Sequence, residues 1–139
     1  NGIILHSHCK DGGSTPPRST MKIYIGHSKD FDFKKELYEP IRESSLNTAH
    51  EIVLPHENSE ELFNSKDFLK NCDLMIAEVS FSKTGLGIEI GWANAFSCPV
   101  ICIYKTGTKP SSGLKDISDT FIEYSNPEDL IEKLKEIIK

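Results

Sequence analysis

Two glutamates separated by a short glycine-containing segment are the residues of this chain best suited to chemistry. Glu78 ends a run of apolar residues, and Glu89 follows Gly85 and Gly87 in the expected first turn of a helix. Glycine lets the backbone approach a ligand closely, and the N-terminus of a helix favours an ionised carboxylate. Two acids that converge on one cleft suit the cleavage of a glycosidic bond, because one attacks the anomeric carbon while another group handles the leaving group's proton.

The same pattern also has a purely structural explanation. A tight turn followed by an acid placed for the helix dipole needs no ligand. The segment is not a dinucleotide fingerprint, because Gly85-x-Gly87 lacks the third glycine and does not follow the first strand. Spacing alone therefore leaves a catalytic and a structural role for Glu89 open.

Strands and helices that alternate along the chain must position these residues. Compact apolar runs and helical spacing predict strands at residues 21–26, 51–54, 74–79, 99–104 and 120–124, and helices at 31–46, 59–71, 88–96 and from 127 onward. This order predicts a single-domain, doubly wound α/β fold of the flavodoxin or Rossmann type, with about five parallel strands and helices on both faces. Ligands of such sheets bind beyond the carboxyl ends of the strands. The candidate segments there are residues 26–29, residues 78–89 and the loop after Tyr104.

Composition restricts the function classes. A net charge of -5 and the absence of a Lys/Arg run argue against binding a nucleic-acid polymer, and no apolar stretch is long enough for a membrane span. The four cysteines form no CxxC pair, so we expect buried reduced thiols and a cytoplasmic location. Residues 1–20 are turn-rich and lack an apolar period, and we expect a disordered leader or a remnant of expression there. The domain is then expected at residues 21–139.

A family resemblance enters with three motifs. Tyr24 in the first strand, the Ala-Glu-Val-Ser run at residues 77–80, and Gly85-x-Gly87-x-Glu89-x-Gly91 together resemble the nucleoside 2-deoxyribosyltransferase family. The sequence is most similar to its small branch, the 2′-deoxynucleoside 5′-phosphate N-hydrolases. The resemblance covers most of residues 21–139 and is strongest at residues 73–95.

The resemblance implies an enzyme that cleaves the N-glycosidic bond of 2′-deoxyribonucleosides or their 5′-monophosphates. Glu89 matches the family nucleophile, which forms a covalent deoxyribosyl intermediate that water or a second base resolves. Tyr24 matches the tyrosine that orients the nucleophile, and Glu78 matches an acid near base and sugar. No metal and no organic cofactor is implied. The resemblance further implies a homodimer or higher oligomer in which a neighbour completes the pocket.

Two positions depart from the family pattern. Where the family has an aspartate that contacts the sugar or helps to protonate the base, this chain has Ser65. Asp67 is a weak substitute, because two residues along a helix rotate a side chain by about 200°. The segment after the first strand has Lys29 and Asp30 where the N-hydrolase branch has a basic, glycine-rich run. The expected substrate-binding residues are Gly26, Ser28, Ser82, Lys83, Gly85, Gly87 and Ser112, of which Ser28, Lys83 and Ser112 are candidates to hold a 5′-phosphate.

Two alternatives remain open at this point. The departure at Ser65 fits a catalytically silent nucleotide-binding module on the same fold. A receiver-like signalling domain is superficially compatible with Asp30 and Lys105, although Glu78 stands where that class needs a phosphorylatable aspartate. Hydrolysis or base transfer, base preference and the size of the oligomer do not follow from the sequence. His27, Trp92 and Asn94 are further residues that would fit the wall of the pocket.

Overall fold

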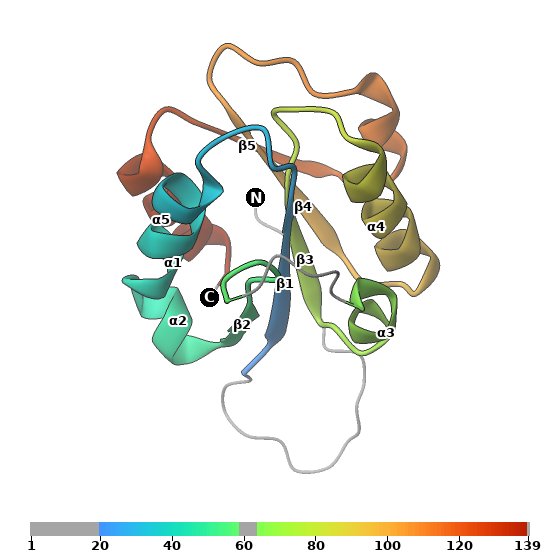
Figure 1. Ribbon diagram of the computed structural model, residues 1–139, viewed down its shortest axis with the longest axis horizontal. Helices are drawn as coiled ribbons and strands as arrows, with labels where there is room; N and C mark the ends of the chain where they lie inside the picture. The colour runs from blue at the N-terminus through green and yellow to red at the C-terminus, as the bar shows by residue number, and fades with distance from the viewer. Residues whose placement is uncertain (1–19, 59–63, 139) are drawn as a thin grey trace.

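A computed structural model describes residues 20–58 and 64–138 of the chain (Figure 1). The expected leader and the expected helix start at Ser59 lie outside the described residues, apart from residue 20. The described part contains one five-stranded sheet, flanked by helices. Its strands are β1 (Lys22–His27), β2 (Glu51–Val53), β3 (Leu74–Glu78), β4 (Val100–Lys105) and β5 (Thr120–Tyr124).

All neighbouring strands of the sheet pair in parallel, in the order β2-β1-β3-β4-β5. This is the strand order of flavodoxin-like folds, and the predicted α/β architecture is confirmed. The direction of winding reverses between β1 and β3, which pair from Ile23 with Leu74 to His27 with Glu78. Ligands of doubly wound sheets bind at such a switch point, beyond the carboxyl ends of the strands.

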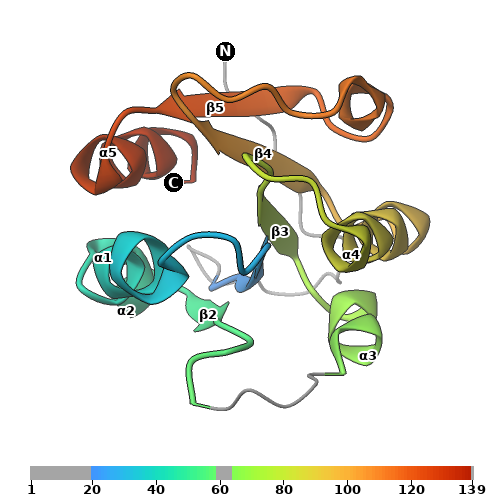
Figure 2. The same cartoon turned by 45° about the horizontal axis from the view of Figure 1, so that its top comes forward.

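Helices cover both faces of the sheet. Figure 2 shows α1, α2 and α5 on one side and α3 and α4 on the other. These helices span Glu39–Arg42 (α1), Ser45–Ala49 (α2), Ser65–Lys70 (α3), Thr84–Ala95 (α4) and Pro127–Ile137 (α5). Each face buries its own hydrophobic cluster, so the sheet separates two cores.

The alternation of side chains along the strands assigns each residue to one core. On β1, Ile23 and Ile25 belong to the cluster under α1 and α5, whereas Tyr24 belongs to the cluster under α4. Successive strand residues point to opposite faces, so Gly26 shares the face of Tyr24. The same parity on β3 places Ile76 on the α1 and α5 side. This parity decides which functional side chains meet.

The helix predicted at residues 31–46 is broken into shorter pieces. A π-helical turn η1 spans Lys34–Tyr38, where the amide of Glu39 donates to the carbonyl of Lys34. Pro40 follows at once and has no amide hydrogen, so it donates no bond to the helical ladder. Ser44 has extended backbone and caps α2 by accepting from the amide of Leu46. One continuous helix was therefore wrong for this segment, because helical backbone runs through Pro40 to Arg42 but is interrupted at Ser44.

Helix α4 begins earlier than the sequence indicates. It starts at Thr84, so Gly85 and Gly87 lie inside its first turns and do not form a tight turn before it. Glu89 is the sixth residue of the helix, in the second turn, and the first turn contains no acid. The expected dipole placement of Glu89 is therefore wrong. The predicted cap of α5 is confirmed, since Asn126 accepts from the amide of Asp129.

The segment predicted as a loop after β4 contains the short 3-10 helix η2 (Ser112–Asp116). Cys72, Cys98 and Cys102 are free and buried, as expected for reduced core thiols. Within residues 20–58 and 64–138, no helix is both long and apolar enough to cross a bilayer. In the same ranges, no group of three metal-binding side chains comes together.

Candidate active site

The carboxyl ends of β1 and β3 open onto a cavity of about 580 Å³. Its wall combines the end of β1 and the following segment, residues 55 and 56 after β2, the start of α3, and the first half of α4. This is the switch point where the topology predicts a ligand. The lining side chains that carry the argument below are Tyr24, His27, Ser28, Lys29, Asp30, His56, Ser65, Lys83, Glu89 and Trp92.

A carboxylate and a phenol form the centre of this cavity. The hydroxyl of Tyr24 donates to Oε2 of Glu89 across 2.9 Å, although the two residues are 65 positions apart in sequence. Tyr24 is buried in β1, and Glu89 is half-buried on α4. Burial, and next the carboxylate of Glu89, raise the pKa of Tyr24 above its usual value. The phenol therefore keeps its proton and fixes one oxygen of the carboxylate.

Ser65 extends this pair into a chain of three groups. Its side chain lies at the start of α3, is buried, and makes a hydrogen bond to Tyr24 that lowers the phenol's pKa. The residue that departs from the family pattern thus belongs to the site and supports Tyr24.

Gly26 lies beneath the carboxylate of Glu89 and makes room for Met75 and Leu86. A Cβ atom at this position would lie 3.5 Å from Oε1 of Glu89, 3.2 Å from Leu86 Cδ1 and 2.5 Å from Met75 Cε. The contact with Oε1 would be an ordinary one, whereas Met75 and Leu86 would have to move, so the absence of a side chain at Gly26 mainly serves the packing of these two residues. Oε1 therefore lies over Gly26, while Oε2 is held by Tyr24.

A buried histidine connects two walls of the cavity. The carbonyl of Ser28 can only accept, so Nδ1–H of His27 donates to it at 2.7 Å. Nε2 of neutral His27 then accepts from the hydroxyl of Tyr38 at 2.6 Å, and the same hydroxyl accepts from the amide of His56 at 3.0 Å. Burial lowers the pKa of His27 to about 4, so the ring is neutral at physiological pH. Sequence reasoning mentioned His27 without assigning it a role, and His56 carried no signal.

The segments after β1 and β3 are held together above the sheet. Phe31 stacks on Phe81 with ring centroids 5.8 Å apart, and the ammonium of Lys105 lies 4.6 Å from the centroid of Phe31. Next to them, Nζ of Lys83 pairs with Asp30 at 3.4 Å. Lys105 also pairs with Glu36, an arrangement unlike the receiver-type site considered above. These contacts fix Asp30 and Lys83 on the cavity wall.

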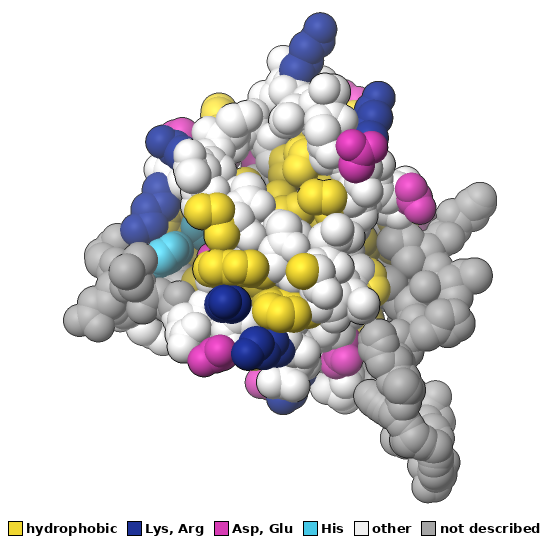
Figure 3. Space-filling model, turned by 90° about the vertical axis from the view of Figure 1, so that its right-hand side faces the viewer, with side chains coloured by type: hydrophobic (Ala, Val, Ile, Leu, Met, Phe, Trp, Pro, Cys, Tyr) yellow, Lys and Arg dark blue, Asp and Glu magenta, His cyan; other side chains and the backbone are white. Residues whose placement is uncertain are grey.

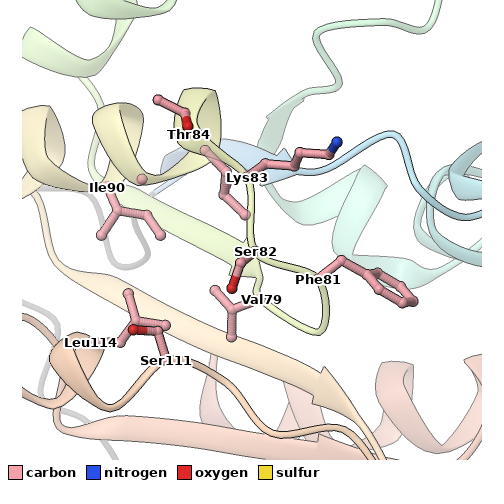
Figure 4. A pocket seen from close by; sticks show the side chains of 10 residues that line it. Val79, Phe81, Ser82, Lys83, Thr84, Ile90, Ser111 and Leu114 are labelled. Atoms are coloured by element: carbon pink, nitrogen blue, oxygen red, sulfur yellow. The ribbon is translucent and has the colours of Figure 1, made fainter.

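A second cavity of about 390 Å³ lies on the other side of Lys83 and Leu86. In Figure 4, Val79, Ser82 and Ile90 surround it together with Ser111 and Leu114. The predicted binding residues Ser82 and Gly87 line this cavity and not the one that contains Glu89. Ser112 lines neither of the two, because η2 begins there and Ser111 takes the position on the wall.

The expected convergence of Glu78 and Glu89 on one cleft is not found. Glu78 has no exposed surface and lines neither cavity. Its carboxyl group accepts from the amide and hydroxyl of Ser80, at 2.9 and 2.8 Å, and from the hydroxyl of Tyr124. Strand alternation explains this, because Glu78 shares the α1 and α5 face with Ile76, opposite the face of Tyr24. Glu78 therefore fixes the end of the sheet and not a ligand.

Asp67 also lies away from the cavity. Its side chain is 68% exposed, pairs with Lys70, and bonds to Asn64 at the start of α3. Since Ser65 faces the cavity two residues earlier, the helical rotation turns Asp67 to solvent. Among the described residues that line the cavity, the second carboxylate is Asp30, which the sequence indicated only as a departure from the family pattern and as a feature compatible with a receiver-like domain.

The outer face of α3 and α4 carries apolar side chains flanked by lysines (Figure 3). Ile88 on α4 is 48% exposed and is the exposed large hydrophobic residue of the described chain. Lys66 lies 5.8 Å from the ring centroid of Trp92, and Lys70 lies 5.9 Å from that of Phe96. The cavity with Glu89 opens beside this face, since Ile88 and Trp92 also line it.

Solved structures with the same fold include a nucleotide N-glycosidase. Clostridium botulinum CMP N-glycosidase, BcmB, superposes with a TM-score of 0.60 at 24% identity, over 82% of this chain and 98% of that one. The chain has a nucleoside 2-deoxyribosyltransferase-like fold. A conserved protein from Enterococcus faecalis V583 matches with a TM-score of 0.58 at 21% identity, over 85% of this chain and 99% of that one. No protein-family profile matches the sequence, and no curated protein does. The likeness at these identities is one of fold.

Proposed function

We propose that this protein cleaves the N-glycosidic bond of 2′-deoxyribonucleosides or their 5′-monophosphates, with Glu89 as the nucleophile. The observation that carries the proposal is the hydrogen bond of 2.9 Å from Tyr24 to Glu89, inside a cavity at the switch point of the sheet. A fixed carboxylate at the wall of a ligand-sized cavity is the feature that covalent glycosidases need. The shared fold of a CMP N-glycosidase supports the same reaction class.

The reaction proceeds by two displacements at C1′ of the sugar. Tyr24 holds Oε2 of Glu89, so Oε1, which lies over Gly26, attacks C1′ as the bond to the base breaks. The base leaves with the bonding electron pair and is protonated by solvent, because Glu78 and Asp67 do not line the cavity and the carboxylate of Asp30 is paired with Lys83. Water, or the nitrogen of a second base, then attacks C1′ and frees Glu89. Net retention at C1′ follows from two inversions.

Deoxyribose suits this route for a chemical reason. Positive charge develops on C1′ in the transition state, and a 2′-hydroxyl would withdraw electrons from it. Tyr24, which is hydrogen-bonded to Ser65, donates to the attacking carboxylate and supplies no proton to the base. We therefore expect substrates whose bases leave readily without strong acid assistance from the protein.

The test measures release of free base by chromatography from each deoxynucleoside, each 5′-monophosphate and the corresponding ribo compounds. Glu89→Gln keeps the shape and the acceptor for Tyr24 and should lower kcat at least a thousandfold. The matched control is Glu132→Gln, an exposed acid on α5, which should leave kcat unchanged. Base release that persists in Glu89→Gln at the wild-type rate would disprove the assignment of the nucleophile. Adding a different free base separates transfer from hydrolysis.

A catalytically silent nucleotide-binding module is the second candidate, and the absence of a carboxylate beside Glu89 at position 65 favours it. This module would be stabilised by deoxynucleotides in a thermal-shift assay without releasing base over many hours. Turnover that depends on Glu89 would exclude it.

We further propose that the protein is cytoplasmic and self-associates through the outer face of α3 and α4. The exposure of Ile88 beside the cavity supports this surface. Ile88→Glu should lower the mass measured by light scattering after gel filtration, whereas Lys135→Glu, at an exposed position on α5, should not change the oligomer size. A wild-type protein that elutes as a monomer at high concentration would contradict the proposal.

A further inference from the structure

The cavity with Glu89 contains balanced charges. Of its lining side chains, Lys29 and Lys83 carry positive charge at neutral pH, and Asp30 and Glu89 carry negative charge. Burial keeps His27 neutral, with a pKa of about 4. A 5′-monophosphate adds between one and two negative charges near neutral pH. A phosphate inside this cavity therefore meets two carboxylates as well as two lysines, so the cavity has no net positive charge to attract it.

One of the two cavity lysines that would compensate a phosphate, Lys83, is already paired with Asp30. The carboxylate of Asp30 pairs with the ammonium of Lys83 at 3.4 Å. The backbone amide of Asp30 donates to the hydroxyl of Ser28 at 3.2 Å, so this amide is not available as a phosphate donor. Lys83 is the residue just before α4, at the positive end of that helix. Asp30 thus neutralises the part of the wall that would otherwise attract an anion.

The position of Asp30 is fixed by its neighbour in sequence. Phe31 is stacked on Phe81 with centroids 5.8 Å apart, and Lys105 lies over both rings at 4.6 and 5.7 Å. His27 holds the carbonyl of Ser28 on the other side of Asp30. The backbone on both sides of Asp30 is therefore anchored, which keeps residue 30 at the cavity wall, where its side chain pairs with Lys83.

From this arrangement we propose that Asp30 is a specificity-determining residue, which makes the site select neutral deoxynucleosides over their 5′-monophosphates. The proposal rests on the proposed function and names its substrate class. It departs from the CMP N-glycosidase of shared fold, whose named substrate carries a phosphate. Repulsion between a phosphate dianion and one carboxylate a few ångströms away in a water-like medium corresponds to about tenfold in affinity.

The experiment compares kcat/KM for each of the four common deoxynucleosides with kcat/KM for its own 5′-monophosphate. Wild-type protein should favour the deoxynucleoside. Asp30→Asn should shift the ratio toward the monophosphate by about tenfold, because Lys83 and the N-terminus of α4 are then left to attract the phosphate. The matched control is Asp32→Asn, an exposed acid two residues on that lies outside the cavity wall, which should leave the ratio unchanged.

Ionic strength supplies a readout that a merely structural role of Asp30 would not change. Salt screens charges over a Debye length of about 10 Å at 0.1 M. Raising the salt concentration from about 0.05 to about 0.5 M should therefore weaken the preference for deoxynucleosides in wild type and change it little in Asp30→Asn. The proposal for Asp30 would be overturned if wild type prefers monophosphates, or if Asp30→Asn changes the ratio of the two kcat/KM values by less than twofold. Base release in the same assay would still support the proposed function.

If no compound releases base, the proposed function fails and the charge selectivity is judged separately. The same pairs of compounds are then compared in binding, by calorimetry with wild type, Asp30→Asn and Asp32→Asn. If wild type binds the deoxynucleoside more tightly than the monophosphate and Asp30→Asn removes this preference, the role given to Asp30 is supported. Equal binding of both compounds to wild type would reject it.

Discussion

Replacing Tyr24 by phenylalanine isolates the hydrogen bond that holds Glu89. The variant removes one hydroxyl and keeps the ring, which is 1% exposed and packs 5.9 Å from the ring centroid of Phe68. It deletes the donor at 2.9 Å from Glu89 and leaves the hydroxyl of Ser65 without its partner on Tyr24. A hydrogen bond to a charged group contributes about 1.5–3 kcal/mol. If the bond acts in the transition state, kcat/KM should fall about ten- to a hundredfold.

The assay is steady-state release of base, measured alongside the free energy of unfolding in urea. The free energy of unfolding should fall by about 1–3 kcal/mol, because the variant leaves the buried hydroxyl of Ser65 without its partner on Tyr24. Tyr104→Phe removes the same atom from a half-buried tyrosine on β4 that lines neither cavity, and should retain wild-type activity. A Tyr24→Phe protein that is folded and within twofold of wild-type kcat/KM would refute the role given to the phenol.

Three further predictions concern the surrounding structure. Burial lowers the pKa of His27 from 6.5 to about 4, so the unfolded chain binds a proton at a higher pH than the folded chain does. About 3 kcal/mol of folding stability, fully present above pH 6.5, should therefore be lost as the pH falls toward 4. Urea unfolding at several pH values should show this loss in wild type and not in His27→Gln. Gly26→Ala places a methyl group 2.5 Å from Met75 Cε and beside Glu89. We expect the free energy of unfolding to fall by about 1–3 kcal/mol and the activity to be lower. An unaltered kcat/KM would argue against close packing at this position. Asn126→Ala removes the cap of α5 and should cost about 1 kcal/mol without affecting base release, which thermal unfolding and the activity assay check together.

Much of the architecture was predictable because it depends on local patterns. Short apolar runs identified all five strands, and their alternation with helices implied the parallel sheet. Asn126 followed by Pro127 located the start of the last helix. The helix at residues 31–46 failed because Ser44 adopts extended backbone and caps a separate helix, which apolar spacing does not reveal.

The sequence by itself determined the type of sheet, the segments at its carboxyl edge, and the choice of Glu89 and Tyr24 through family resemblance. Only the tertiary structure decided which of the acids share a cavity. Glu78 lies one strand away from Tyr24 but on the opposite face, and Asp67 lies one helical half-turn from Ser65 and faces solvent. Asp30 joins Glu89 instead, although the two are 59 positions apart (89 minus 30). The physical reason is that side-chain direction depends on strand parity, helix phase and the exact residue at which an element begins, and a shift of one residue reverses the result.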